Sequence, residues 1–197
     1  MAYDKKAFLK GVTLLCDTAE KENRHILTAL DSMGVRYQPF NMLFGDYSFT
    51  VDGRDFSLLC AIERKANIEE LYGNLTHDRE RIEKEFNLAS KVANDFVLLL
   101  ENCSGMNQME TYLLPDYVMR RDNRKVQEIG KECYATIQSW KSGNKYKFDT
   151  IFVKDPSLTA LRMVEHFYYW WRNFKILSAN RRNYKRTGNG GDIACRS

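Results

Sequence analysis

The sequence lacks the long apolar segments of membrane and exported proteins. No apolar run approaches the ~18 residues of a membrane span, and the segment after Met1 lacks the hydrophobic region of a secretion signal. None of the five cysteines forms a CxxC pair, which argues against a structural zinc site. We therefore expect a cytoplasmic protein with buried, reduced thiols, no membrane contact and no structural zinc.

Internal repeats, low-complexity tracts and long linkers are also missing. A hydrophobic content of 44% and an aromatic content of 13% argue against disorder. A chain of 197 residues is long enough for one well-buried core. These features predict a single domain over residues 1–197.

Apolar runs and helical spacing alternate along the chain. The expected strands are 12–16, 35–40, 47–51, 56–64, 96–100 and 150–153. The expected helices are 25–33, 68–92 with a possible break near Thr76–His77, 123–140 and 158–177. Asp52-Gly53 is typical of a turn that joins two strands into a β-hairpin. This pattern predicts an α/β fold, a mixed central β-sheet flanked by helices on both faces.

Two acidic residues and a lysine stand out on the predicted hairpin. Asp46 lies at the start of one strand, and sixteen residues separate it from Glu63, which is followed by Arg64-Lys65. Side chains alternate faces along a strand, so Glu63 and Lys65 share one face while Arg64 points to the other. A four-residue loop would pair Asp46 with Ala61 and make Asp46 and Glu63 diagonal neighbours. A shift of one residue would put Asp46 on the wrong face.

Two converging carboxylates provide the oxygen ligands that Mg²⁺ prefers. Their burial is costly unless a cation neutralises them, and a metal ion beside Lys65 would do so. The pattern also fits a salt-bridge ladder on an exposed hairpin, which would contribute little to stability. The spacing of these residues leaves both interpretations open.

The segment GDYS…AIERK resembles the signature of the XPF family, a branch of the PD-(D/E)xK nucleases. That signature is Gly-Asp, a spacer, Glu-Arg-Lys, three residues and Asp. Gly45-Asp46 and Glu63-Arg64-Lys65 match it, whereas Glu69 or Glu70 stands in place of the final Asp. The resemblance implies a restriction-endonuclease-like core at about residues 12–101, with a helical, basic part at about 120–197. The later stretches look like compact single-domain members from bacteria and their phages.

The resemblance also implies roles for the matched residues. Asp46, Glu63 and the backbone carbonyl of Arg64 would bind Mg²⁺ or Mn²⁺, and Lys65 would orient or deprotonate the attacking water. A lysine beside a cation has a lowered pKa, which suits a proton acceptor.

Upstream, LLCDTAEKEN is similar to the family's Asp-x-Arg-Glu element. Asp17 and Glu20 match it, while Ala19 replaces the arginine. Asp17 would supply a further carboxylate to the catalytic or metal site; the alternative is that it caps the following helix. Glu20 is expected to be catalytic.

Several basic residues are candidate DNA contacts. The segment GNLTHDRERIEKEF resembles the helix that carries a family arginine, here Arg79 or else Arg81; Arg79 also suits an ion pair with Glu83. Arg64 would contact a phosphate or pair with Glu69 or Glu70. Two further basic clusters suit phosphates, although solvated helix ends explain them equally well: Arg120, Arg121, Arg124 and Lys125, and then Arg172, Lys175, Arg181, Arg182, Lys185 and Arg186.

The sequence therefore predicts a metal-dependent DNA endonuclease, selective for flaps, junctions or nicks, that acts in repair, recombination or phage DNA metabolism. A catalytically inactive, XPF-like DNA-binding or scaffold protein is the alternative, and an RNA-directed nuclease is a third. No organic cofactor is expected. The aromatic stripe Phe167–Trp171 predicts some exposed surface and a homodimer, with base stacking as the rarer alternative.

Overall fold

A computed structural model describes residues 5–121 and 127–187 of the chain. The strands are β1 (Val12–Asp17), β2 (Arg36–Phe40), β3 (Tyr47–Val51), β4 (Arg54–Asp55), β5 (Cys60–Lys65), β6 (Asp95–Glu101) and β7 (Asp149–Val153). The helices are α1 (Lys5–Gly11), α2 (Arg24–Ser32), α3 (Ile68–Thr76), α4 (Arg79–Val92), α5 (Met106–Glu110), α6 (Asp116–Arg121), α7 (Ile129–Ser142), a short 3₁₀ turn (Pro156–Leu158) and α8 (Thr159–Thr187). None of the described helices is both long and apolar enough to cross a membrane.

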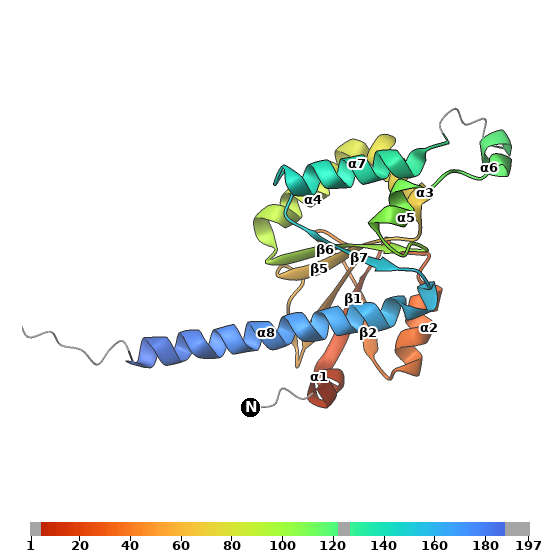
Figure 1. The fold of residues 1–197 in the computed structure, drawn as a ribbon. Helices are drawn as coiled ribbons and strands as arrows, with labels where there is room; N and C mark the ends of the chain where they lie inside the picture. Colours follow the sequence, from red (N-terminus) through yellow and green to blue (C-terminus); the bar gives the residue numbers. More distant parts are fainter. Residues whose placement is uncertain (1–4, 122–126, 188–197) are drawn as a thin grey trace, which may run out of the picture.

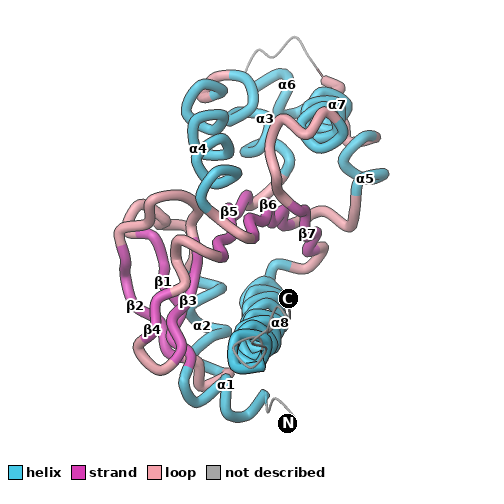
Figure 2. Tube along the Cα trace, turned by 90° about the vertical axis from the view of Figure 1, so that its left-hand side faces the viewer, coloured by secondary structure: helices cyan, strands magenta, loops and turns pink. Residues whose placement is uncertain are grey.

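All seven described strands belong to one mixed sheet in the order β2-β1-β3-β5-β6-β7, with β4 paired to β3 (Figure 1). β3 runs antiparallel to both β1 and β5, whereas β5, β6 and β7 run parallel. Helices α4 and α7 lie on one side of the sheet, and α1, α2 and α8 lie on the other (Figures 1 and 2). The predicted fold class is therefore confirmed.

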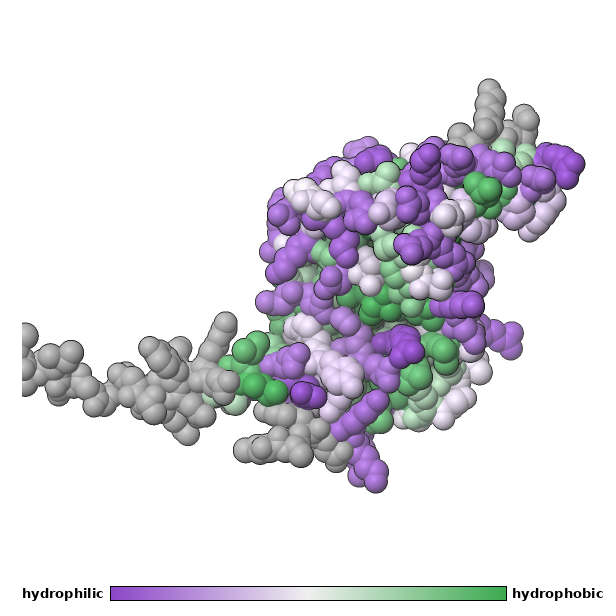
Figure 3. All heavy atoms as spheres, viewed as in Figure 1, coloured by the Kyte–Doolittle hydropathy of each residue, from purple (hydrophilic) through white to green (hydrophobic). Residues whose placement is uncertain are grey.

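The helices pack on the sheet through two separate cores. One contains Phe8, Phe49 and Phe167 on the α8 side, and the other contains Phe86, Phe96 and Trp140 on the α4 and α7 side. On the face shown in Figure 3, apolar residues are visible between the upper helices and α8. β5 and β6 are buried between the two cores, which accounts for the continuous apolar run at the centre of β6.

The predicted hairpin differs from the structure in its turn. Asp52 and Gly53 both have positive φ, 51° and 78°, and form a two-residue turn that pairs Val51 with Arg54. Such turns match the twist of the flanking strands, so the predicted four-residue loop is wrong. The predicted strand 56–64 is also interrupted, because the backbone turns at Phe56, whose carbonyl accepts bonds from the amides of Leu59 and Cys60.

Other element bounds differ where apolar periodicity is weak. The helix expected at 68–92 is two helices, α3 and α4, separated at His77–Asp78 near the expected break. The helix expected at 123–140 begins only at Ile129, and residues 122–126 lie outside the described part. α8 continues ten residues beyond the expected end to Thr187. Its last turns are rich in Asn, Arg and Lys and offer no apolar stripe by which to recognise a helix.

Candidate active site

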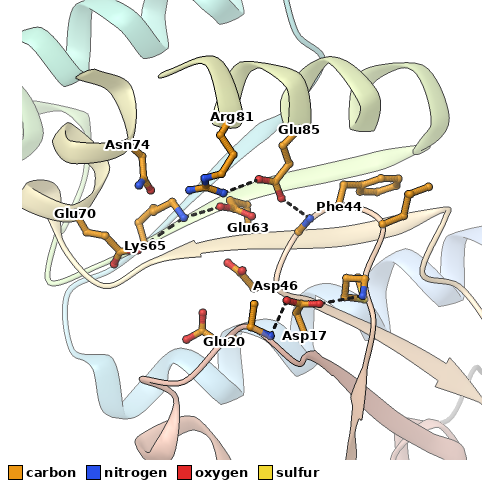
Figure 4. Close-up of a pocket in the computed structure, with 14 residues that line it drawn as sticks. Asp17, Glu20, Phe44, Asp46, Glu63, Lys65, Glu70, Asn74, Arg81 and Glu85 are labelled. Carbon is orange, nitrogen blue, oxygen red and sulfur yellow. Dashed lines mark hydrogen bonds and ion pairs between the residues drawn. The ribbon is translucent and has the colours of Figure 1, made fainter. Parts of the chain in front are cut away.

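A polar hollow of about 440 Å³ lies where β5 ends, between α3 and α4 and the loops after β1 and β2. Six carboxylates and two basic groups line it (Figure 4): Asp17, Glu20, Asp46, Glu63, Glu70 and Glu85, with Lys65 and Arg81. The structure therefore gathers five residues predicted as catalytic in one hollow: Asp17, Glu20, Asp46, Glu63 and Lys65. The excess of negative charge favours a cationic ligand.

The pairing of β3 with β5 brings Asp46 next to Glu63. Tyr47 pairs with Ile62, and the Asp46 amide donates a 2.8 Å hydrogen bond to the Ile62 carbonyl. The expected register placed Tyr47 opposite Cys60, two residues away. A shift of two keeps every side chain on its face, so the carboxylates still point into the same hollow. The exposed salt-bridge ladder does not fit, since Glu63 is 2% exposed.

Gly45 permits this approach of the two strands. Its φ is +72°, and a Cβ there would lie 3.1 Å from the Ile62 carbonyl oxygen. The positive φ and the tight contact both favour glycine at this position. The glycine of the motif thus places Asp46 against β5.

Neither carboxylate is fully neutralised by its surroundings. Burial and the nearby Glu63 raise the pKa of Asp46 well above its usual value, although its Oδ2 accepts a 2.7 Å bond from the Arg64 amide. Glu63 Oε1 accepts a 2.5 Å bond from Lys65 Nζ. Glu63 Oε2 is buried without a hydrogen-bond partner among the described residues. A buried carboxylate oxygen without a donor is costly and is well placed to accept a cation.

Lys65 is fully charged in this environment. Burial lowers the pKa of its amine, but the carboxylates of Glu63 and Asp46 outweigh burial and raise it above the ordinary value. The lowered pKa of Lys65 was expected beside a bound cation and stays a prediction.

Glu85 on α4 is a pocket residue that the sequence analysis missed. Its Oε1 accepts a 2.7 Å bond from the Gly45 amide, and its Oε2 lies 3.6 Å from Arg81 Nη1. Burial and Glu63 raise the pKa of Glu85 to about 8. Glu85 occupies the buried stripe of α4 beside Ile82 and Phe86. An acid within an apolar stripe was the signal that could have identified it.

Glu85→Gln is expected to weaken the pH dependence of stability. Folded Glu85 keeps its proton up to about pH 8, whereas the ordinary pKa is 4.5. The folded state then binds more protons between these values, so the free energy of unfolding falls as pH rises through that window. At pH 8 the free energy of unfolding of the variant should exceed that of the wild type by on the order of 2–4 kcal/mol. The raised pKa of Asp46 also makes stability fall as pH rises, so part of the pH dependence should remain in Glu85→Gln.

Urea unfolding in EDTA at pH 5 and pH 8 measures this difference. The matched control is Glu80→Gln, because Glu80 lies on the same helix and its side chain is 86% exposed. An unchanged slope in Glu85→Gln would contradict the role of burial and Glu63.

The structure distinguishes between several residues that the sequence left as alternatives. Arg81 lines the hollow, whereas Arg79 pairs with Glu83 at 2.8 Å on the exposed side of α4. Glu70 lines the hollow and accepts a bond from the Ala66 amide at 2.8 Å, whereas Glu69 accepts a bond from the Tyr112 hydroxyl. Arg81 and Glu70 are therefore the members of each pair that face the candidate site.

Asp17 shapes the loops of the hollow. Its two carboxylate oxygens accept bonds from the amides of Met42, at 2.9 Å, and Ala19, at 3.0 Å. The N-cap of α2 is Asn23, so Asp17 does not cap that helix. Asp17 holds together the loops that follow β1 and β2.

Arg64 lies on the opposite face of β5 from Glu63 and is 4% exposed. Its guanidinium bonds Glu20 at 2.9 Å and Glu101 at 2.6 Å. The expected contact with a DNA phosphate, or with Glu69 or Glu70, is therefore wrong, because Arg64 is buried between two other acids. Glu101, which the sequence analysis missed, also accepts bonds from Thr159 and His25. These contacts tie the start of α8 to the site.

Only part of the two basic clusters can be placed. Arg120 is exposed on α6, and Arg121 ends that helix, although its side chain is not described. Arg124 and Lys125 lie outside the described residues. Arg181, Arg182, Lys185 and Arg186 lie on the last turns of α8 without described side chains, and α8 extends beyond the sheet (Figure 1).

The aromatic stripe of α8 is mostly core. Phe167, Tyr168 and Trp171 are buried and Trp170 is half-buried, whereas Tyr169 is 54% exposed. The prediction that part of the stripe is exposed therefore holds for Tyr169, beside which Arg172 lies at 5.9 Å from the ring centre. The homodimer stays a prediction.

Comparison with known proteins gives structural matches alone. No family model and no curated protein matches the chain. XPF from Aeropyrum pernix matches with a TM-score of 0.53 and 17% identity, over 80% of this chain and 60% of that one. XPF from Aeropyrum pernix in complex with DNA matches with a TM-score of 0.52 and 18% identity, over 82% of this chain and 65% of that one. The chain thus spans less than two thirds of these relatives, and across that span it has the XPF-type nuclease-domain fold that its sequence motifs predicted.

Proposed function

We propose that this protein is a metal-dependent endonuclease that hydrolyses DNA phosphodiester bonds. The observation that carries the proposal is the pair of half-buried Asp46 and buried Glu63, which lie side by side in a polar hollow with Lys65 hydrogen-bonded to Glu63. These residues belong to Gly45-Asp46 and Glu63-Arg64-Lys65, which resemble the XPF signature. The fold is that of XPF structures.

The residues present fit a hard divalent cation such as Mg²⁺ or Mn²⁺. Glu63 Oε2 lacks a hydrogen-bond donor among the described residues, and the pKa of Asp46 is raised by burial and by Glu63. A hard cation takes oxygen ligands and removes the repulsion between such acids. Asp46, Glu63 and the backbone carbonyl of Arg64 would hold it, with Glu85 or Asp17 contributing from the edge of the hollow. When bound, such an ion lowers the pKa of water and stabilises the charge of a phosphodiester under attack.

Lys65 acts next to this site in one of two ways. As an ammonium it orients the attacking water and stabilises negative charge on the phosphate. Once the acids are neutralised, the pKa of Lys65 falls, and its amine becomes able to accept a proton from that water. Both roles need Nζ to stay close to Glu63, which the 2.5 Å hydrogen bond provides.

DNA would be held through its phosphates. Arg81 lines the hollow with a side chain that is 59% exposed, so it is the best placed basic group for the phosphate next to the cut. Arg120 and the basic end of α8 would contact more distant phosphates. Phosphate contacts carry little sequence information. We therefore propose selectivity for DNA shape, such as flaps, junctions or nicks, in repair, recombination or phage DNA metabolism.

The alternative is an inactive, XPF-like protein that binds DNA or a partner. Ala19 favours it, because the motif arginine is missing beside Asp17 and Glu20. The intact Asp46, Glu63 and Lys65 favour the enzyme, because burying two acids without a catalytic or metal-binding use would only lower stability.

A cleavage assay separates the two functions. Labelled duplex, single-stranded, flap and four-way-junction DNA is incubated with Mg²⁺, Mn²⁺ or EDTA. We expect cleavage with either metal, none in EDTA, and a loss of at least about 10²-fold in Lys65→Ala because the water is no longer oriented. The control Lys84→Ala changes an exposed lysine on α4 that pairs with Glu80. Metal-dependent binding without cleavage would support the inactive protein, and cleavage in EDTA would contradict the mechanism.

A further inference from the structure

A second cluster of potential metal ligands lies away from the candidate active site. Cys60 Sγ, an Asp95 carboxylate oxygen and a ring nitrogen of His166 lie within 4.8 Å of one another. They come from the starts of β5 and β6 and from α8, so no local sequence spacing reveals them. The absence of CxxC pairs predicted no zinc site, but ligands brought together by the fold escape that criterion.

We propose that Cys60, Asp95 and His166 form a binding site for Zn²⁺ or a similar transition-metal ion. One thiolate, one carboxylate and one imidazole are a donor set that zinc accepts, with water in the fourth position. The harder Mg²⁺ prefers oxygen ligands, so this site and the carboxylate site should select different ions.

One donor separation already suits a tetrahedral ion, and a second is shorter. Zinc–ligand bonds of ~2.0–2.3 Å imply donor–donor separations of ~3.3–3.6 Å. Cys60 Sγ lies 3.6 Å from Asp95 Oδ2, whereas His166 Nε2 lies 2.7 Å from the same oxygen in a hydrogen bond. The imidazole–carboxylate pair needs to open by about half an ångström to admit the ion.

Coordination replaces protons at two of the three ligands. Cys60 releases its thiol proton to solvent. The ring proton of His166 that bonds Asp95 from Nε2 moves to Nδ1 by exchange with solvent, which leaves Nε2 free to bind the ion. Asp95 coordinates as a carboxylate and exchanges the bonds it accepts from the other two for a bond to the ion.

The site is accessible from solvent on one side. Cys60 is fully buried, but the side chains of Asp95 and His166 are 19% and 22% exposed. Asp95 also lines a hollow of about 150 Å³ with Asp149 and Lys147. The partly exposed side chains of Asp95 and His166 give an ion a route of entry from solvent.

The cluster is independent of the candidate active site. Cys60 faces the core on the α8 side of the sheet, whereas Glu63 points to the other face, and the two residues are ~10 Å apart along the strand. One ion therefore cannot bridge both sites. An ion at Cys60 would link α8 to two strands of the sheet, which is a structural role that does not depend on nuclease activity.

Zinc binding to the full-length protein tests the proposal. The background is Glu63→Gln, so that the carboxylate site contributes little, and zinc is titrated by equilibrium dialysis with thermal unfolding in parallel. We expect one zinc per chain and a higher unfolding temperature. His166→Gln and Cys60→Ser should each weaken binding at least about 100-fold. Cobalt should give a thiolate charge-transfer absorption that disappears in Cys60→Ser.

The controls are Cys133→Ser, which changes a buried thiol elsewhere, and His77→Gln, which changes another histidine. Serine can keep the hydrogen bond to Asp95, so a purely hydrogen-bonded cluster predicts no difference between Cys60→Ser and the background. Equal zinc affinity in the two, or no zinc binding at micromolar concentration, would overturn the site. If Cys60→Ser does not fold, the zinc affinities of Asp95→Asn and His166→Gln test the site instead. Cleavage is not measured, so failure of the proposed nuclease function leaves this result unaffected.

Discussion

Asp46→Asn is expected to reduce DNA cleavage at least about 10³-fold and to raise the stability of the metal-free protein. Asparagine has the shape of aspartate and can still accept the bond from the Arg64 amide, so the fold is retained. It removes one negative charge from the pair of acids and thus weakens metal binding. The raised pKa of Asp46 means that its carboxylate is destabilising at neutral pH. Its removal should add ~1–3 kcal/mol to the free energy of unfolding.

Cleavage rates and urea unfolding in EDTA measure the two effects on the same protein. In addition, Mn²⁺ should raise the unfolding temperature of the wild type and leave that of Asp46→Asn nearly unchanged. Asp31→Asn is the matched control, because Asp31 is exposed on α2. Cleavage by Asp46→Asn at the wild-type rate would remove the proposed mechanism.

Arg64→Met should produce the largest loss of stability among these variants. The guanidinium lies between Glu20 and Glu101, and its hydrogen bond helps to lower the pKa of Glu101 against the effect of burial. Methionine has a similar length but no charge, so both acids lose their buried partner. Breaking a buried ion pair from one side costs ~3–5 kcal/mol, which urea unfolding at pH 7 will detect.

Arg79→Met is the matched control, because it removes an arginine from an exposed i,i+4 pair that contributes only ~0.5 kcal/mol. The comparison also tests the interpretation drawn from the sequence, in which Arg64 contacts DNA. If Arg64→Met kept its stability and lost only affinity for DNA, the buried network would not have the role assigned to it.

The sequence predicted what depends on local patterns. Alternation of faces placed Glu63 and Lys65 together and Arg64 on the opposite face, and the two motif halves located Asp46. The partner of Arg64 escaped prediction, because Glu101 lies 37 residues away at the end of β6. Glu85 escaped because Arg81 and Glu85 look like a solvent-exposed helix pair in sequence. Contacts between distant elements depend on how strands and helices pack, which periodicity does not describe.

The turn register illustrates the same limit. The choice between a two-residue and a four-residue turn at Asp52-Gly53 depends on the twist of both strands. The interruption at Phe56–Leu59 has no clear sequence signal, since the segment is as apolar as a strand. The predicted faces of Asp46 and Glu63 were still correct, because the observed register differs from the predicted one by two residues.

The interruption at Phe56–Leu59 lies in the segment that joins Gly45-Asp46 to Glu63-Arg64-Lys65. β5 is anchored to β6 by six residue pairs and to β3 by one, so its position does not depend on the hairpin that precedes it. Phe56 and Ser57 are buried, whereas Leu58 is 49% exposed, so residues added beside Leu58 would enlarge a surface loop and leave Glu63 in place. The number of residues between Gly-Asp and Glu-Arg-Lys therefore carries little chemical information, and a search for related proteins should let that gap vary.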